Sequence, residues 1–324
     1  MDKLSIIRQP VSEELAKYRK LFDESLTHED DFLGHALSYV RQRKGKMMRP
    51  LLVLLMAKEK GEVSDKSLRS AVTLELLHTA SLVHDDVVDE SGERRGQRSV
   101  NAVYDNKVAV LLGDYLLSTS LLEATLTHDI KIVRLISRLG GILSEGEIYQ
   151  LDNIKKERVS EEAYFRVIEH KTASLFAACA ELGALSANAD EEYVRRAKRF
   201  GELVGICFQI RDDIFDYYAD PSIGKPTGND MAEGKLTLPV IYALKHTKRE
   251  DVREWAARVK RGEATVEEIA QLVDYTKQSG GIDYAEQTMN RLHGEAVELL
   301  NAWTNEAVRN ALKGYIDYVV ERKL

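Results

Sequence analysis

Two acidic clusters with the same spacing are the residues of this chain best suited to metal chemistry. They read DDVVD at 85–89 and DDIFD at 212–216. On an α-helix the first and last residues of such a cluster share a face, about 6 Å apart along the axis. Like charges at that spacing destabilise a helix unless a cation compensates them. Carboxylate oxygens in this arrangement suit Mg²⁺, which completes its coordination shell with water and phosphate oxygens.

The segments that lead into the clusters indicate where they lie in the protein. Residues 71–89 and 201–217 are apolar nearly all round, which is typical of helices buried at the centre of a protein. A solvated acidic helix end would explain one such cluster. Two matching clusters, each on an otherwise apolar helix, favour a metal site.

Other metal chemistries fit the sequence less well. No set of His and Cys residues has the spacing of a zinc site. The doublet His84-Asp85 is typical of all-α metal-dependent phosphohydrolases, which remain an alternative. In such an enzyme the cluster at 212–216 would have no purpose.

Basic residues near the clusters indicate an anionic ligand. Any one of them alone is more often a solvated surface charge. As a set beside two metal-binding helices they are typical of diphosphate binding, because Arg, Lys and Mg²⁺ together neutralise phosphoryl oxygens. The set comprises Lys46, Arg49, Arg94, Arg95, Lys171, Lys225 and Lys235.

Composition excludes several other classes of protein. The 324 residues are 44% hydrophobic and 31% charged, with a net charge of −7, so the chain can bury a large core and is not expected to coat nucleic acid. Cys179 and Cys207 lie in apolar segments and are predicted to be buried free thiols. No signal-peptide pattern or apolar run of about 20 residues is present, so a cytoplasmic protein without stable membrane insertion is expected.

The proline distribution and apolar periodicity predict the fold class. No proline occurs between Pro50 and Pro221, and apolar residues recur there at helical spacing. We therefore expect an all-α fold in one domain over 1–324, with core motifs at 45–240 and C-terminal helices at 241–324. Pro50 suits the first turn of a helix that ends near Gly61.

An ordered series of motifs resembles the trans-isoprenyl diphosphate synthases (polyprenyl synthetases). The resemblance extends from about residue 40 to 324. Its motifs are HTASLVHDDVVDESGERRG at 78–96, LLGDYLLS at 111–118, GEIYQ at 146–150, KTASLF at 171–176, FQIRDDIFDY at 208–217, GKPTGNDMAEGKLTLP at 224–239 and a closing DYVVERK.

The resemblance implies a single-domain bundle of mostly antiparallel helices, the isoprenoid synthase fold, with both acidic clusters facing a central cavity. It implies a homodimer and about three Mg²⁺ ions per site with substrate bound. By motif, Asp85, Asp89 and Asp212 would bind the metal, and Asp86, Asp213 and Asp216 would support them directly or through water.

The same resemblance assigns the cationic residues to two substrates. The allylic prenyl diphosphate would be bound by Arg94, Lys171, Thr172, Gln209, Lys225 and Lys235. Isopentenyl diphosphate would be bound by Lys46, Arg49, His78 and Arg95. Taken alone, His78 would ordinarily be a core histidine, but it lies two helical turns before Asp85 on the same general side.

One motif departs from the family pattern. The family usually reads Gly-Gly-Lys-Arg-x-Arg-Pro, where this chain has KGKMMRP at 44–50. Because Lys46 and Arg49 are retained, isopentenyl diphosphate binding is expected to persist with an altered loop. Together with His78 and Arg95, these residues argue against a non-catalytic partner subunit. The complete second cluster argues against a class I terpene cyclase.

The residues upstream of the first cluster bear on product length. Ala80 and Ser81 are small at positions where the resemblance implies aromatic rings in farnesyl synthases, and Leu77, Leu76 and Thr73 beneath them are not aromatic. We therefore predict a long-chain product, heptaprenyl to octaprenyl. Small residues could instead serve tight helix packing, geranylgeranyl or farnesyl diphosphate synthase is the alternative enzyme, and a non-enzymatic helical scaffold is the alternative of another class.

Overall fold

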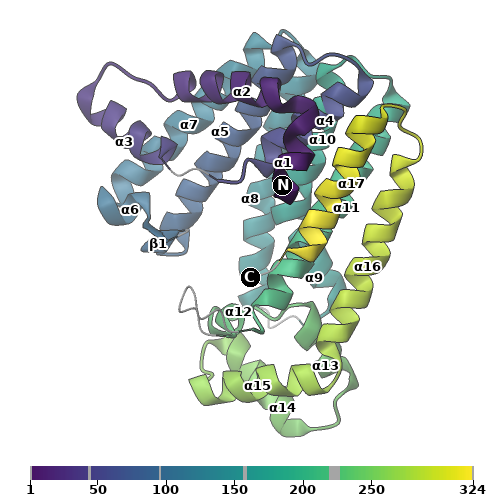
Figure 1. The fold of residues 1–324 in the computed structure, drawn as a ribbon. Coiled ribbons are helices and arrows are strands. Elements are labelled where there is room, and N and C mark those ends of the chain that lie inside the picture. The colour runs from purple at the N-terminus through teal and green to yellow at the C-terminus, as the bar shows by residue number, and fades with distance from the viewer. Residues whose placement is uncertain (1, 43–44, 95, 156–158, 219–226, 323–324) are drawn as a thin grey trace. The chain divides into compact units, whose positions relative to one another are not determined.

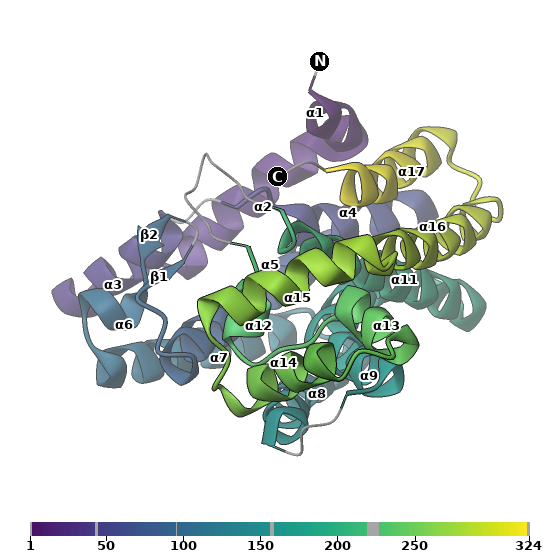
Figure 2. The ribbon, with the colours of Figure 1, turned by 90° about the horizontal axis from the view of Figure 1, so that it is seen from below.

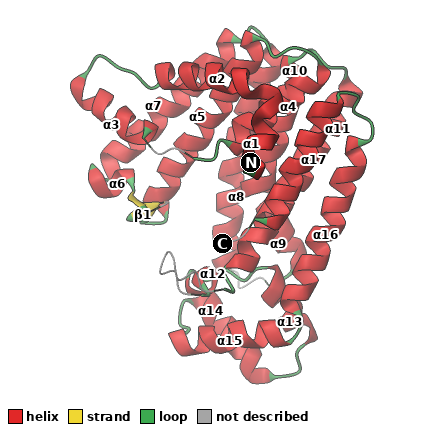
Figure 3. Cartoon of the chain, in the orientation of Figure 1, coloured by secondary structure: helices red, strands yellow, loops and turns green. Residues whose placement is uncertain are grey.

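Helices make up nearly all of the regular structure in the computed structural model (Figure 3). The structure describes residues 2–42, 45–94, 96–155, 159–218 and 227–322. Within these ranges the strands are β1 (Glu93–Arg94) and β2 (Gln97–Arg98), a two-residue antiparallel pair. The all-α prediction is therefore confirmed.

The chain divides into two compact units. The first contains Met1–Gly141, Leu175–Gly201 and Ala302–Gly314, and the second contains Ile142–Ser174, Glu202–Asn301 and Tyr315–Leu324. Four of the described helices contribute residues to both units: α8 (Ile130–Lys155), α10 (Ser174–Ser186), α11 (Glu191–Phe215) and α17 (Glu306–Glu321).

The first unit is built around α5 (Asp65–Val88), which lies beside α7 (Asn106–Leu126) in both ribbon views (Figures 1 and 2). The capping box of Ser64 and Ser67 starts α5 six residues before the predicted segment 71–89. Most side chains of α5 are buried, as its all-round apolar pattern predicts. The other elements of this unit are α1 (Lys3–Arg8), η1 (Gln9–Val11), α2 (Ser12–Ser25), α3 (Asp31–Arg41), α4 (Met48–Lys60), α6 (Val100–Val103) and α10 (Ser174–Ser186).

The helix α4 confirms the prediction made from its proline. Pro50 lies in the first turn, and Gly61 is the residue at the C-terminal cap. The helices α4 and α10 pack closely at Gly183 of α10, where an added Cβ would lie 2.4 Å from the Val53 carbonyl oxygen. Two helix backbones can approach this closely because one of them presents no side chain.

The second unit carries the second acidic cluster on α11. This helix ends at Phe215, so the last aspartate of the cluster follows it directly. The later elements of this unit are α9 (Glu161–Ile168), η2 (Glu169–Ala173), α12 (Asn229–Ala232), α13 (Leu238–His246), α14 (Glu250–Arg261), α15 (Val266–Gln278) and α16 (Gly281–Leu300). Among them, α15 packs on both α13 and α14, and the three lie together in both ribbon views (Figures 1 and 2).

Both cysteines are buried free thiols, as predicted. Burial raises the pKa of the Cys207 thiol to about 12 and raises the pKa of Cys179 further. Neither thiol is therefore ionised at neutral pH, and neither is suited to nucleophilic chemistry.

Among the described helices, α7 is long and apolar enough to cross a membrane by length and composition. Core helices pass the same test, and 39% of its apolar window is buried within the structure. Its exposed side bears Val110, Leu111, Leu121 and Leu122.

Candidate active site

In the first cluster, at the end of α5, the second aspartate is the buried one. The Asp86 side chain is 0% exposed, and the Arg94 Nε donates a hydrogen bond of 2.5 Å to its Oδ1. Asp85 is half-buried and Asp89, the C-cap residue of α5, is exposed. Arg94 of β1 thus neutralises the carboxylate that the protein encloses, whereas the two predicted metal ligands reach solvent.

His84 is held by the neighbouring helix α7. Its Nε2 lies 3.1 Å from the Val110 carbonyl oxygen, which can only accept, so this nitrogen carries the proton and donates. A Cβ on Gly113 would lie 2.2 Å from the same atom, so the ring occupies a notch that the glycine provides. The Nε2 atom therefore holds the ring against α7 and is not available to bind a metal.

In the second cluster, Asp213 is the centre of a buried hydrogen-bond network. Tyr164 donates to Asp213 Oδ2 at 2.6 Å, and Gln209 Nε2 donates to Oδ1 at 2.8 Å. Thr172 donates in turn to Gln209 Oε1 at 2.7 Å, which sets the orientation of the amide. Burial, and next the charge of Asp230, raise the pKa of Asp213 well above its usual range.

Asp216 holds the segment that begins at Gly228. Its carboxylate accepts hydrogen bonds from the backbone amides of Asn229 (3.0 Å) and Asp230 (3.1 Å), and its carbonyl accepts from the Gly228 amide at 2.9 Å. Its supporting role at the metal stays a prediction, but in the structure Asp216 organises the backbone of this segment. It also brings Asp230 to the cluster, a residue that our sequence reasoning missed although it lies in the quoted motif GNDMAEGK.

Lys171 and Thr172 lie in η2, a π-helical turn between α9 and α10. Such turns are frequent at functional sites. The turn packs closely on α8, where a Cβ on Gly146 would lie 2.9 Å from the Lys171 backbone nitrogen. The Lys171 Nζ pairs with the Glu147 carboxylate at 2.7 Å and also reaches Gln150 Oε1 at 3.5 Å. The motif GEIYQ therefore positions the lysine, a role that its sequence alone did not reveal.

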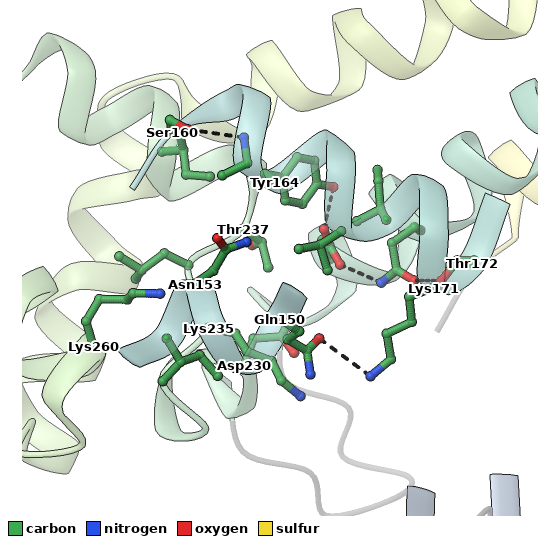
Figure 4. Close-up of a pocket in the computed structure, with 18 residues that line it drawn as sticks. Gln150, Asn153, Ser160, Tyr164, Lys171, Thr172, Asp230, Lys235, Thr237 and Lys260 are labelled. Carbon is green, nitrogen blue, oxygen red and sulfur yellow. Dashed lines mark hydrogen bonds between the residues drawn. The ribbon is translucent and has the colours of Figure 1, made fainter. Parts of the chain in front are cut away.

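A cavity of about 170 Å³ lies within the second unit beside these residues (Figure 4). Its wall combines three lysines with the buried carboxylate network and apolar side chains from α9 and α13. Lys235 and Lys171 were predicted to bind the allylic diphosphate, whereas Lys260, which also lines the cavity, was not predicted. The polar lining residues are Gln150, Asn153, Ser160, Tyr164, Lys171, Thr172, Gln209, Asp213, Asp230, Lys235, Thr237 and Lys260.

Of the residues predicted to bind isopentenyl diphosphate, Lys46, Arg49 and His78 lie in the first unit. The Arg49 guanidinium stacks over the Phe176 ring, 5.2 Å from its centroid, and His78 is buried. The Lys46 carbonyl accepts a hydrogen bond of 2.6 Å from Arg8. Met47, where the family usually has Arg, adopts a left-handed backbone conformation with φ of 53°. The altered motif therefore forms a turn that α1 holds through Arg8.

The structure brings together only part of the predicted site. Arg95 and Lys225 lie outside the described residues. The first cluster belongs to the first unit together with Lys46, Arg49, His78 and Arg94, and the second cluster belongs to the second unit with Lys171, Thr172, Gln209 and Lys235. That the two clusters face one cavity stays a prediction.

The donor set fits a hard divalent cation. The predicted ligands offer only carboxylate oxygens, which Mg²⁺ prefers. In the described ranges no three His, Cys, Asp or Glu side chains gather as a complete metal site. Water and substrate phosphate oxygens would therefore supply the rest of the shell, as is usual for Mg²⁺.

The predicted chain-length residues lie on one face of α5. Ala80 and Leu77 are buried and Ser81 is half-buried. One turn further down, Leu76 and Thr73 are also buried, and none of the five carries an aromatic ring.

We expect Tyr164→Phe to lower the free energy of unfolding by about 1–3 kcal/mol, because the buried Asp213 carboxylate loses a donor. Urea denaturation measures the change. Tyr218→Phe, at an exposed tyrosine of the same unit, is the matched control and should change stability by less than about 0.5 kcal/mol. Equal stability of the two variants would contradict the stabilising role of the Tyr164–Asp213 hydrogen bond.

Comparison with known proteins identifies the family. The sequence profile described as Polyprenyl synthetase matches residues 30–276. The octaprenyl diphosphate synthase of Haemophilus influenzae is 34% identical over 307 residues, which cover 93% of this chain and 91% of that protein.

Two crystal structures are similar over nearly the whole chain. One is a geranylgeranyl pyrophosphate synthase from Bacteroides thetaiotaomicron, 48% identical, with a TM-score of 0.88 over 99% of this chain and 100% of that one. The other is a polyprenyl synthase from Caulobacter crescentus complexed with calcium and isoprenyl diphosphate, 28% identical, with a TM-score of 0.91 over 99% and 98% of the two chains. The chain therefore belongs to the polyprenyl synthetase family and is a prenyltransferase with the all-α isoprenoid synthase fold.

Proposed function

We propose that this enzyme condenses isopentenyl diphosphate with an allylic prenyl diphosphate and releases diphosphate, making a long-chain all-trans polyprenyl diphosphate. The cavity of the second unit is the observation that carries the proposal. Its wall places the cations of Lys171 and Lys235 beside the buried network of Asp213. Cations and carboxylates concentrated at one cavity suit a diphosphate bound together with a divalent metal.

The protein's own residues would prepare both substrates for reaction. Lys171, Lys235 and Arg94 bind the allylic diphosphate and stabilise its charge as the allylic carbon–oxygen bond breaks. Mg²⁺, expected as about three ions held by Asp85, Asp89 and Asp212, supplies further positive charge to the departing diphosphate when bound. This metal-ligand assignment also accounts for the calcium in the Caulobacter relative's structure.

The second substrate supplies the electrons of the new bond. Lys46, Arg49, His78 and Arg95 hold isopentenyl diphosphate so that its double bond attacks the allylic carbon. A carbon–carbon bond forms, the product cation loses a proton to the released diphosphate, and a new double bond results. Apolar walls exclude water, which would otherwise capture the allylic cation.

We expect Asp85→Ala and Asp212→Ala each to lower the condensation rate by about 1000-fold or more, because each removes a metal ligand. Incorporation of radiolabelled isopentenyl diphosphate measures the rate, and circular dichroism checks that the variants fold. Asp274→Ala, at an exposed aspartate of α15, is the control and should keep normal activity. Near-normal condensation by either site variant would disprove the assignment.

The product is proposed to be heptaprenyl to octaprenyl diphosphate. The support is the face of α5 that carries Ala80 and Leu77, because no aromatic side chain there would stop a growing chain. The octaprenyl synthase relative agrees with this length, whereas the geranylgeranyl synthase relative makes a shorter product and defines the alternative.

We expect the series Ala80→Val, Ala80→Leu and Ala80→Phe to shorten the product progressively, because larger side chains obstruct the face on which the chain grows. Mass spectrometry of the products measures their length. Thr79→Phe adds a ring on the opposite side of α5 from Leu77 and Ser81 and should leave the length unchanged. A wild-type product no longer than geranylgeranyl diphosphate would overturn the long-chain proposal.

We further propose that the enzyme works in the cytoplasm as a homodimer whose subunits pair through α7. Val110, Leu111, Leu121 and Leu122 form an exposed apolar face on this helix. Asp114 lies exposed on the same face, and a charge there fits an interface between proteins better than it fits lipid. Apolar patches of this kind commonly mark protein interfaces.

Replacement of both Leu111 and Leu122 by Glu should convert the dimer into a monomer, because four charges per dimer would be buried without partners. Light scattering after size-exclusion chromatography measures the mass. Val266→Glu, at an exposed apolar residue of α15, should leave the mass unchanged. A monomeric wild-type protein, or a variant that remains dimeric, would exclude this interface.

A further inference from the structure

Arg322, the residue directly after α17, lies against the first aspartate of the second cluster. Its Nη2 donates a hydrogen bond of 2.5 Å to Asp212 Oδ1 and another of 2.9 Å to the Phe208 carbonyl. The Asp212 side chain is 42% exposed, whereas that of Arg322 is only 17% exposed. The carboxylate predicted to bind metal therefore already has a cation as its partner.

The guanidinium occupies a place that several groups define. It stacks on the Phe208 ring, 3.9 Å from its centroid, with the Phe215 ring at 5.5 Å. Arg211 donates through Nε (3.2 Å) and Nη2 (3.0 Å) to the Arg322 carbonyl, which fixes the backbone. Because α11 supplies the rings, the carboxylate and the second arginine, the position of Arg322 is determined by that one helix.

We propose that Arg322 is the resident counter-ion of Asp212 and competes with the divalent cation for it. The inference rests on the proposed function, in which Asp212 binds metal. A guanidinium on Oδ1 and a divalent cation on the same carboxylate repel each other, so metal binding favours the release of Arg322. The displaced residue leaves the Phe208 ring and loosens the C-terminal end of α17. Arg322 is thus a positioning residue that couples metal binding to the order of this helix end.

Metal binding without any diphosphate tests the competition directly. Mn²⁺ is titrated into the full chain and followed by electron paramagnetic resonance. We expect Arg322→Gln to bind Mn²⁺ at the second cluster about fivefold more tightly than wild type. This change in affinity corresponds to the loss of one partly exposed ion pair. Arg322→Met, which keeps apolar contact with Phe208, should behave alike. Arg291→Gln removes the same charge from an exposed position on α16 and should leave the affinity for Mn²⁺ unchanged.

Hydrogen exchange gives a second measurement that does not depend on activity. Addition of Mg²⁺ should increase amide exchange at residues 318–322 of the wild type by at least about threefold, and Arg322→Gln should exchange fast with or without metal. The proposal would be overturned if both Arg322 variants bound Mn²⁺ no more tightly than wild type. It would also be overturned if Mg²⁺ did not change the amide exchange rates of residues 318–322 in the wild type.

One further variant separates this inference from the proposed function. If Asp212→Asn binds Mn²⁺ as tightly as wild type, Asp212 is not a metal ligand, and both the proposed site and the competition fail. If Asp212→Asn weakens binding and the Arg322 variants do not strengthen it, the metal site stands and only the role of Arg322 fails.

Discussion

Negative charge concentrated at the ends of two apolar helices is the constraint on which the rest of the site depends. An enclosed carboxylate without a partner would cost several kcal/mol. Several of the cluster aspartates have partners within the protein that reduce this cost. Arg94 pairs with Asp86, and Arg322 pairs with Asp212. Backbone amides bind Asp216. These partners compensate part of the negative charge within the protein itself, although the predicted metal ligands are all acids.

The sequence predicted the parts of this arrangement that depend on local periodicity. All-round apolar residues predicted the buried helices that became α5 and α11, and the acidic spacing predicted which aspartates share a face. Proline and glycine predicted the limits of α4. Such features depend on residues close together in the chain, so a pattern of 3.6 residues per turn reveals them.

Contacts between distant segments were beyond this kind of reasoning. Glu147 and Lys171 pair across different helices, and the close approach that allows it depends on Gly146 and a π-helical turn. Asp230 reaches the second cluster only because Asp216 binds its amide. Each of these residues lies in a motif that the sequence displays. The motif shows that the residue matters to the family, but its partner is set by tertiary packing.

Helix geometry explains why, in each cluster, the second aspartate is buried and the first is accessible. The second aspartate of each cluster is rotated about 100° from the first around the helix axis. That rotation turns Asp86 and Asp213 into the protein, where each is almost fully buried and takes donors from other elements. Asp85 and Asp212 remain accessible at the same level of the helix. One adjacent pair of acids therefore provides an internal anchor for the helix end and an accessible carboxylate, which is the predicted metal ligand, and the net charge of −7 reveals neither.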